Sequence, residues 1–219
     1  MAPQPVQRSV APRPAAGRLE EILSRKGFRF VAGVDEVGRG ALAGPLVAAA
    51  VVLDSRRFPK GLCDSKLLEP EEREILAPRI LSQAVAVSYV VVAPEDIDDG
   101  GLGVANVEAL RQAVRSLRVV PDYVISDHFP LDDDTVPWIG LPKADCMSAA
   151  VAAASIVAKV SRDAHMCELN AQHPGYHFAS NKGYGSDEHW AAIRALGPSP
   201  VHRRSFRGVG SYQAELEGL

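Results

Sequence analysis

The sequence predicts an α/β fold, with a mixed five-stranded sheet flanked by helices and a small helical C-terminal portion. Two observations support this prediction. Three short apolar runs joined by hairpin-type connections come first, and a strand-helix-strand crossover follows them, so antiparallel and parallel pairs are combined. With 219 residues, 47% of them hydrophobic, the chain can bury one substantial core and does not require two domains.

Five segments have the composition of β-strands. The first leads into two adjacent acids, and the second is a Val- and Ala-rich run bounded by Gly44-Pro45 and Asp54, which is typical of a buried strand returning beside the first. The expected strands are 28–36, 44–53, 85–92, 122–126 and 136–141.

Helices are expected between and after these strands. Pro70 is expected to begin a short helix that runs to about Ser82. Proline is tolerated in the first turn because the backbone N–H that it lacks has no partner within the helix there. The apolar residues Val107, Leu110, Val114 and Leu117 recur at helical spacing. An alanine-rich helix is expected over about 148–168. Residues 1–17 are Pro-, Ala- and Arg-rich without periodicity, so we expect a disordered leader before a single domain over 18–219.

Composition indicates a soluble, cytoplasmic protein. No apolar run approaches the length of a membrane span, and the first residues lack a signal-peptide pattern. The three cysteines include no Cys-x-x-Cys pair, which fits reduced thiols. The net charge is only −3, so there is no overall basic surface for nucleic acid. The acidic runs 95–99 and 132–134 are expected to be solvated loops.

The most informative segment places two carboxylates beside a bare backbone. Asp35 and Glu36 end the first strand, and Gly38 and Gly40 flank Arg39, where another backbone can approach closely. This combination indicates a metal and a phosphate ester. Neighbouring strand residues point to opposite faces, so both acids serve one site only if the strand ends or bulges there, or if a backbone carbonyl replaces one side chain.

Two alternatives remain for this segment. The acids could be a solvated strand end followed by a Gly-Arg-Gly turn. The glycines also resemble a dinucleotide-binding turn, but that motif needs a helix next, and Pro45 is followed by a strand-like run.

Further carboxylates are expected to converge on Asp35. Asp127 ends the fourth strand and Asp145 precedes the long helix, so all three can meet at one sheet edge. Crowded carboxylates repel one another unless divalent cations neutralise them, and oxygen ligands suit Mg²⁺ or Mn²⁺. Taken singly, Asp127 could be a turn former and Asp145 a helix-capping acid.

The long helix carries one polar line on a mostly apolar surface. Ser148, Ser155, Lys159 and Arg162 recur at helical spacing. The line is either a solvated face or a track toward a phosphate backbone, and Lys159 can also pair with Asp163 one turn later.

Six blocks of sequence form one pattern and follow one another in order. The blocks are Gly33–Pro45, Asp64–Lys66, Lys143–Asp145, Ala152–Asp163, Lys182–Gly185 and Gly197–Phe206. Together they resemble the successive motifs of bacterial ribonuclease HII, a type 2 ribonuclease H. The resemblance implies a ribonuclease H-like catalytic domain that hydrolyses the RNA strand of RNA/DNA hybrids and incises at ribonucleotides embedded in duplex DNA. It implies a two-metal site with Mg²⁺ or Mn²⁺ held by Asp35, Glu36, Asp127 and Asp145.

The same resemblance implies how substrate is recognised. Gly38, Arg39, Gly40 and Tyr184 would contact the ribose 2′-hydroxyl at an RNA-to-DNA junction, because that group distinguishes RNA from DNA. Further substrate contacts are expected from Lys66, Ser155, Lys159 and Arg203. A monomer is expected, since no interface signal is visible. The alternative function is a non-catalytic hybrid-binding module on the same fold. Ribonuclease HIII is disfavoured because about 18 residues, too few for its additional domain, precede the core.

Three positions depart from the family pattern. His128 follows Asp127 where a small residue is more usual, which puts the local loop geometry in doubt. Cys146 and Met147 replace a more polar pair after Asp145, so a phosphate contact is expected to be missing there. Ala41 replaces a proline and should loosen the turn slightly.

Overall fold

The structure is a computed structural model that describes residues 17–54, 59–62, 65 and 68–211. The expected leader, residues 1–17, lies outside this range except for Gly17, so its disorder stays a prediction. The elements in chain order are α1 (Arg18–Arg25), β1 (Val31–Val37), β2 (Leu46–Val52), α2 (Pro70–Gln83), β3 (Ala86–Val92), α3 (Pro94–Gly100), α4 (Leu102–Arg115), β4 (Tyr123–Asp127), β5 (Trp138–Leu141), the 3-10 turn η2 (Ala144–Cys146), α5 (Ala149–Gln172), α6 (Phe178–Asn181) and α7 (Asp187–Leu196).

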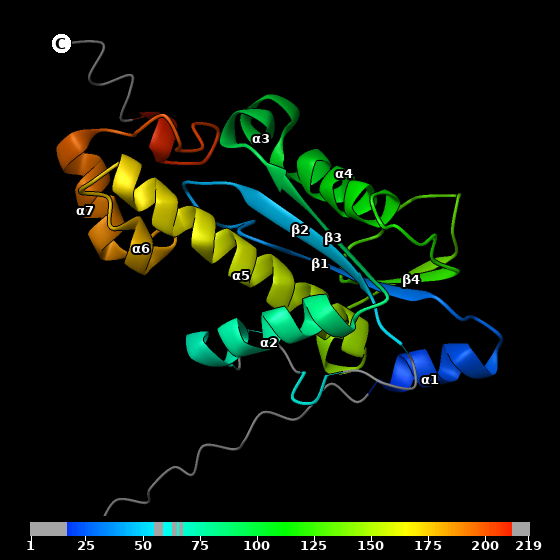
Figure 1. The fold of residues 1–219 in the computed structure, drawn as a ribbon. Coiled ribbons are helices and arrows are strands. Elements are labelled where there is room, and N and C mark those ends of the chain that lie inside the picture. Colours follow the sequence, from blue (N-terminus) through cyan, green and yellow to red (C-terminus); the bar gives the residue numbers. More distant parts are fainter. Residues whose placement is uncertain (1–16, 55–58, 63–64, 66–67, 212–219) are drawn as a thin grey trace, which may run out of the picture.

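A five-stranded mixed sheet forms the centre of the molecule, in the order β3-β2-β1-β4-β5 (Figure 1). The first three strands pair antiparallel, whereas β4 runs parallel to β1 and β5 runs parallel to β4. The fold class predicted from the sequence is therefore confirmed, together with all five strands. The parallel pairing matters for the site, because it brings the carboxyl ends of β1 and β4 to the same edge of the sheet.

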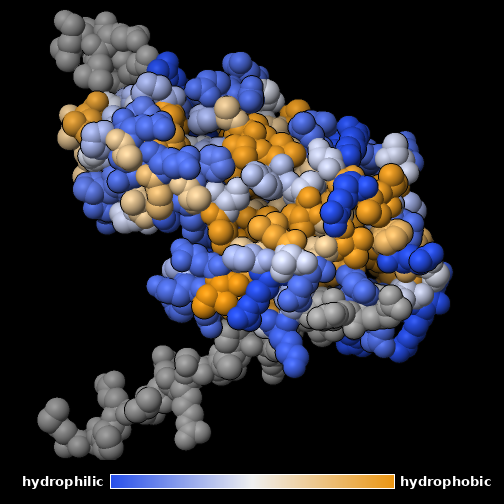
Figure 2. All heavy atoms as spheres, viewed as in Figure 1, coloured by the Kyte–Doolittle hydropathy of each residue, from blue (hydrophilic) through white to orange (hydrophobic). Residues whose placement is uncertain are grey.

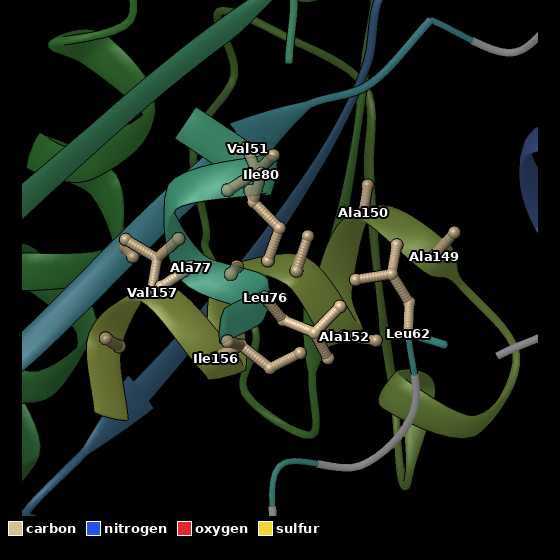
Figure 3. Packing of buried hydrophobic residues seen from close by; sticks show 14 of the residues in the cluster. Val51, Leu62, Leu76, Ala77, Ile80, Ala149, Ala150, Ala152, Ile156 and Val157 are labelled. Atoms are coloured by element: carbon tan, nitrogen blue, oxygen red, sulfur yellow. The ribbon is translucent and has the colours of Figure 1, made fainter. Parts of the chain in front are cut away.

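Helices cover both faces of the sheet because its central strands are apolar on both sides. Every residue of β2 is buried. Val47, Ala49 and Val51 pack against α2 and α5, whereas the alternating residues Ala48 and Ala50 pack against α4. Figure 3 shows α2 and α5 meeting over β2, with Leu76, Ala77 and Ile80 of α2 lying against the side chains of α5.

The alanine-rich α5 lies unusually close to β1, and Gly33 makes this possible. A Cβ atom on Gly33 would lie 2.1 Å from the backbone nitrogen of Val151 and 2.2 Å from the carbonyl carbon of Ala150. The two backbones thus approach each other with no side chain between them, and small residues on α5 keep the rest of the interface thin. This contact sets the depth at which Asp35, two residues further along β1, meets α5.

The acidic run 95–99 differs from expectation, and the C-terminal portion agrees with it. The acidic run 95–99 is not a loop, because it lies within α3, where Pro94 occupies the first turn. One of its acids holds a distant turn, since Asp98 accepts hydrogen bonds from the backbone nitrogens of Arg204 and Ser205 at 2.7 and 3.0 Å. The C-terminal portion is helical as expected, with α6 and α7 at the far end of α5 (Figure 1).

The surface shows where the sheet is not covered. In Figure 2, apolar side chains gather across the middle of the molecule between the helices. The strand β3 forms this edge of the sheet, and Tyr89 and Val91 are among its exposed residues. Within the described residues, the helices are too short or too polar for any of them to cross a membrane.

Substituting Gly33→Ala should destabilise the protein strongly, because the added methyl group meets backbone atoms that no side-chain rotation can move. We expect a loss of about 3 kcal/mol or more in the free energy of unfolding, measured by urea denaturation. Gly103→Ala is the matched control, since a Cβ there meets nothing within 4 Å and the position is helical. That variant should be unchanged or up to about 1 kcal/mol more stable. Equal stability of the two variants would contradict the backbone contact.

Candidate active site

Two of the expected acids lie on neighbouring strands of the same sheet face. Val34 pairs with Ser126 in the parallel register, so Asp35 and Asp127 follow at the ends of β1 and β4. The alternation along both strands places them on the side of α5, because Gly33 contacts that helix and Ile125 packs against Val151. Asp35 is buried and Asp127 is half-buried.

Asp145 is brought to the same edge by η2, the short turn before α5. The residue before it, Ala144, donates its backbone N–H to Oδ1 of Asp127 at 2.8 Å. Asp145 is buried, with 4% of its surface exposed. Three acids that are far apart in the sequence therefore come from one edge of the sheet, as the topology predicted.

Glu36 has a different placement from the other acids. The pairing of β1 with β2 is unbroken from Ala32 to Val37, so the strand neither ends nor bulges at the acid pair. Two of the ways in which Asp35 and Glu36 could share a site are thereby removed, and the Glu36 side chain starts from the opposite face. Among the described residues no three His, Cys, Asp or Glu side chains form a group that could hold a metal ion in this arrangement.

The electrostatics of Asp35 nevertheless fit a cation. Burial, followed by the negative charge of Glu36, raises the pKa of Asp35 well above its usual range, and the charge of Asp127 acts in the same direction. Hydrogen bonds from Ser155 and from the backbone N–H of Glu36 partly offset this effect. A divalent cation would remove the repulsion, and carboxylate oxygens are the ligands that Mg²⁺ and Mn²⁺ prefer. The donor types and their placement therefore fit a metal, provided that the side chains rotate toward it.

The segment Gly38–Pro45, called here the glycine segment, is hydrogen-bonded through its backbone carbonyls to a buried arginine. Arg203 is completely buried. Its Nε and Nη2 donate to the carbonyl of Gly44 at 3.1 and 2.9 Å, and its Nη1 donates to the carbonyl of Arg39 at 3.0 Å. Burial, and then the charge of Arg162, lower the pKa of Arg203 to about 9, so the guanidinium is still charged at neutral pH.

A second buried arginine joins the glycine segment to the segment Lys182–Gly185, called here the tyrosine segment. Arg162 donates from Nε to the carbonyl of Pro45 at 2.9 Å, from Nη1 to that of Lys182 at 2.8 Å and from Nη2 to that of Ala43 at 3.2 Å. The carbonyl of Gly183 completes the junction by accepting the backbone N–H groups of Leu42 and Ala43 at 2.8 and 3.3 Å.

The side chain of Tyr184 projects from this junction. It is 38% exposed, and the guanidinium carbon of Arg162 lies 5.3 Å from the centre of its ring. The glycine segment reaches the acids on its other side, because the Arg39 guanidinium lies 4.9 Å from the ring of Phe129, two residues after Asp127. The residues expected to contact the ribose are thus brought together beside the expected metal site.

The remaining expected substrate contacts fall into different environments. Ser155 is buried and bonds to Asp35 and to Oγ of Ser65, the latter at 2.7 Å. Lys159 is half-buried and pairs with Asp163 at 2.7 Å. Lys66 lies outside the described residues. Arg203 is completely buried, so it does not offer the direct substrate contact that was expected. Arg162 is also completely buried, so the polar line on the long helix is not a solvated face at that position.

A family profile described as Ribonuclease HII matches residues 32–209. This chain belongs to the ribonuclease HII family. The ribonuclease HII of Salinispora arenicola is 49% identical over 195 residues, which are 88% of this chain and 72% of that protein. The ribonuclease HII of Cutibacterium acnes is 50% identical over 192 residues, 87% of this chain and 94% of that protein.

Solved structures agree with the family. The ribonuclease H2 of Pyrococcus horikoshii superposes with a TM-score of 0.73 at 28% identity and covers 87% of this chain and 100% of its own. Bst-RNase HIII, solved in complex with Mn²⁺, shares the fold at 23% identity with a TM-score of 0.63, over 87% of this chain and 71% of its own. The ribonuclease H-like fold implied by the resemblance is therefore confirmed.

The structure accounts for two departures from the ribonuclease HII pattern. His128 has a φ of 65°, a left-handed conformation that glycine adopts without strain because it has no Cβ atom. The doubt about this loop therefore has a physical basis. Ala41 donates its backbone N–H to the carbonyl of Gly38 at 3.2 Å, a bond that proline cannot make, so the expected loosening of the turn is partly offset. Nothing in the structure explains Met147.

The glycines of the ribonuclease HII motif should differ in their effect on stability. Gly38→Ala should cost at least about 2 kcal/mol, because φ is +88° and a Cβ would lie 2.0 Å from Nε of the buried Arg162. Gly40→Ala should stay within about 0.5 kcal/mol of wild type, because nothing lies within 4 Å of a Cβ there. Chemical denaturation of the two variants measures both. A strongly destabilised Gly40→Ala would mean that this glycine also serves the fold.

Proposed function

We propose that this protein is a metal-dependent endonuclease that cleaves the RNA strand of RNA/DNA hybrids and incises at ribonucleotides embedded in duplex DNA. Its membership of the ribonuclease HII family carries the activity. The structural observation that supports it is the convergence of Asp35, Asp127 and Asp145 at one sheet edge, beside an exposed Tyr184 and a bare glycine backbone. Acids for metal-assisted hydrolysis and groups for recognising a sugar are thus adjacent.

We further propose that Asp35, Glu36, Asp127 and Asp145 hold Mg²⁺ or Mn²⁺ as a two-metal site. When bound, such cations activate the attacking water and stabilise the leaving 3′-oxygen, leaving a 3′-hydroxyl and a 5′-phosphate. The raised pKa of Asp35 supports this assignment, because burial and the nearby charges of Glu36 and Asp127 disfavour an ionised carboxylate that no cation neutralises. The unbroken pairing of β1 suggests that Glu36 contributes through its long side chain or its backbone carbonyl.

Recognition of substrate would come from the chain's own residues around the acids. Gly38, Arg39 and Gly40 are proposed to bring backbone groups to the 2′-hydroxyl, and Tyr184 to stack on the sugar that follows. Lys66 and Lys159 are proposed to contact phosphates, with the Lys159–Asp163 pair opening to release the ammonium group. Ser155 and Arg203 act indirectly in this proposal, through Asp35 and the glycine segment respectively.

The proposed working unit is one chain with a single catalytic domain over residues 18–219. All four acids and both recognition segments belong to the same chain, which supports a monomer. Because its substrates are hybrids and duplexes made where DNA is replicated, we propose that the protein acts in the cytoplasm.

Substituting either Asp35→Asn or Asp145→Asn should abolish cleavage of a duplex with one ribonucleotide, while hybrid binding stays within about tenfold of wild type, because phosphate contacts carry most of the affinity. The melting temperature of Asp35→Asn should be equal to or above that of wild type, since the substitution removes a buried, repelled charge. Single-turnover cleavage with Mg²⁺, Mn²⁺ or EDTA tests this. Activity above a few per cent of wild type would exclude the assignment. Metal-independent cleavage by wild type would contradict the two-metal site, and absent cleavage by wild type would favour a binding module.

Tyr184→Ala should reduce incision at a single embedded ribonucleotide far more than duplex binding, because phosphate contacts do not distinguish sugars. Tyr184→Phe should retain more activity than Tyr184→Ala if the ring face makes the contact. Matched duplexes with one ribonucleotide and with a long RNA tract give the comparison. If Tyr184→Ala cleaves both at the wild-type rate, Tyr184 is only a surface turn residue.

A further inference from the structure

Two histidines lie side by side in the interior of the C-terminal portion. His189 on α7 is completely buried and His202 is 1% exposed. Their Nε2 atoms are 3.0 Å apart. On one side, Nδ1 of His189 lies 2.9 Å from the carbonyl oxygen of Tyr184. On the other side, Nδ1 of His202 lies 3.0 Å from the backbone nitrogen of Ser199 and 2.8 Å from its hydroxyl. One line of hydrogen bonds therefore joins Ser199 to Tyr184.

A single arrangement of protons satisfies this line. The backbone N–H of Ser199 can only donate, so Nδ1 of His202 carries no proton and the proton of its ring is on Nε2. That group donates to Nε2 of His189, which must be bare. The proton of His189 is then on Nδ1, where it donates to the Tyr184 carbonyl, which can only accept.

The surroundings favour the neutral form of both rings. Burial lowers the pKa of His189, and burial together with the charge of His189 lowers the pKa of His202 to about 4. The rings of Tyr176 and Phe178 pack against the pair, with Phe178 contacting both histidines. An added proton on either ring would also face an N–H group that already points at it, so the direction of the line is fixed at neutral pH.

The same stretch of chain also contacts the glycine segment. The backbone of His202 forms an isolated bridge with Ala43, and the next residue, Arg203, donates to the carbonyls of Arg39 and Gly44. The dipeptide His202-Arg203 is thus linked to both groups proposed to recognise the sugar, to Tyr184 through His189 and to Arg39 directly. The two side chains differ in chemistry, since His202 is a neutral ring that both accepts and donates a hydrogen bond, whereas Arg203 is charged and only donates.

We propose that His189 and His202 are positioning residues that fix the tyrosine segment through this line of hydrogen bonds, and so set where the Tyr184 ring meets the sugar. The inference rests on the proposed function, in which Tyr184 contacts substrate. Neither histidine touches the substrate, so their effect on incision must pass through Tyr184.

The first test needs no activity. Long-range ¹H–¹⁵N correlation spectra of the full-length, metal-free protein at pH 7 should show His189 with its proton on Nδ1 and His202 with its proton on Nε2. The Nδ1–H form is the less common one in free histidine, so the pattern is diagnostic. A proton on Nε2 of His189, or a doubly protonated ring, would overturn the proposal.

The second test compares substitutions at one position. His189→Asn places an amide N–H near the position of Nδ1 and can still donate to the Tyr184 carbonyl, whereas His189→Leu cannot. We expect single-turnover incision at one ribonucleotide to fall about tenfold in His189→Leu and to stay within about threefold of wild type in His189→Asn. His165→Leu is the matched control, because the hydrogen bond of His165 to the described residues stays within its own helix, to the Ser161 carbonyl at 2.8 Å, and it should change nothing.

A double-mutant cycle separates positioning from general damage. In a Tyr184→Ala background, His189→Leu should cost no more than about twofold, since its route to the substrate is already removed. The same tenfold loss in both backgrounds would overturn the proposal. If His189→Leu does not fold, the comparison of His189→Asn with wild type in both backgrounds decides. If wild type itself incises nothing, the proposed function fails separately, and the Tyr184 ring resonances decide instead: they should move in His189→Leu and stay in His165→Leu.

Discussion

The geometry of the glycine and tyrosine segments depends on how two buried positive charges are hydrogen-bonded. Arg162 and Arg203 are both completely buried, and their guanidinium groups donate to backbone carbonyls of the glycine and tyrosine segments. A buried charge without such partners costs several kcal/mol, so the carbonyls must converge wherever these side chains lie. Two irregular loops thereby acquire the precision that is usually provided by regular secondary structure.

The acids and the tyrosine come from different parts of the fold that meet at one junction. The sheet edge carries the acids, whereas the C-terminal portion carries Tyr184 and the groups that support it. Hydrogen bonds between Gly183 and Leu42-Ala43 connect the two parts directly. Hydrolysis aimed at one sugar in a duplex requires such a connection, because the scissile phosphate must meet the metals only when the correct sugar is in place.

The sequence predicted the sheet well and the arginines poorly, for a physical reason. Strand character and crossover direction are local or pairwise properties, so five strands and the placement of Asp35 and Asp127 at the ends of neighbouring strands followed from patterning. The burial of Arg203 depends instead on carbonyls more than 150 positions away, and nothing near it in the sequence distinguishes it from a surface arginine. The charge of the run 95–99 predicts a loop, whereas in the structure the run follows Pro94 into the first turn of α3. The sequence leaves the role of Glu36 open. It stands next to Asp35 in the acid pair, but neighbouring residues of a strand point to opposite faces of the sheet.

The close approach of β1 and α5 at Gly33 limits which substitutions this interface can accept during evolution. Where two layers are separated by side chains, a loss of volume on one side can be compensated by a gain on the other, and related proteins drift through many such pairs. Here backbone faces backbone, so no compensating partner exists. We therefore expect divergence within the family to accumulate on the opposite face, against α4, while the α5 interface stays restricted to the smallest residues.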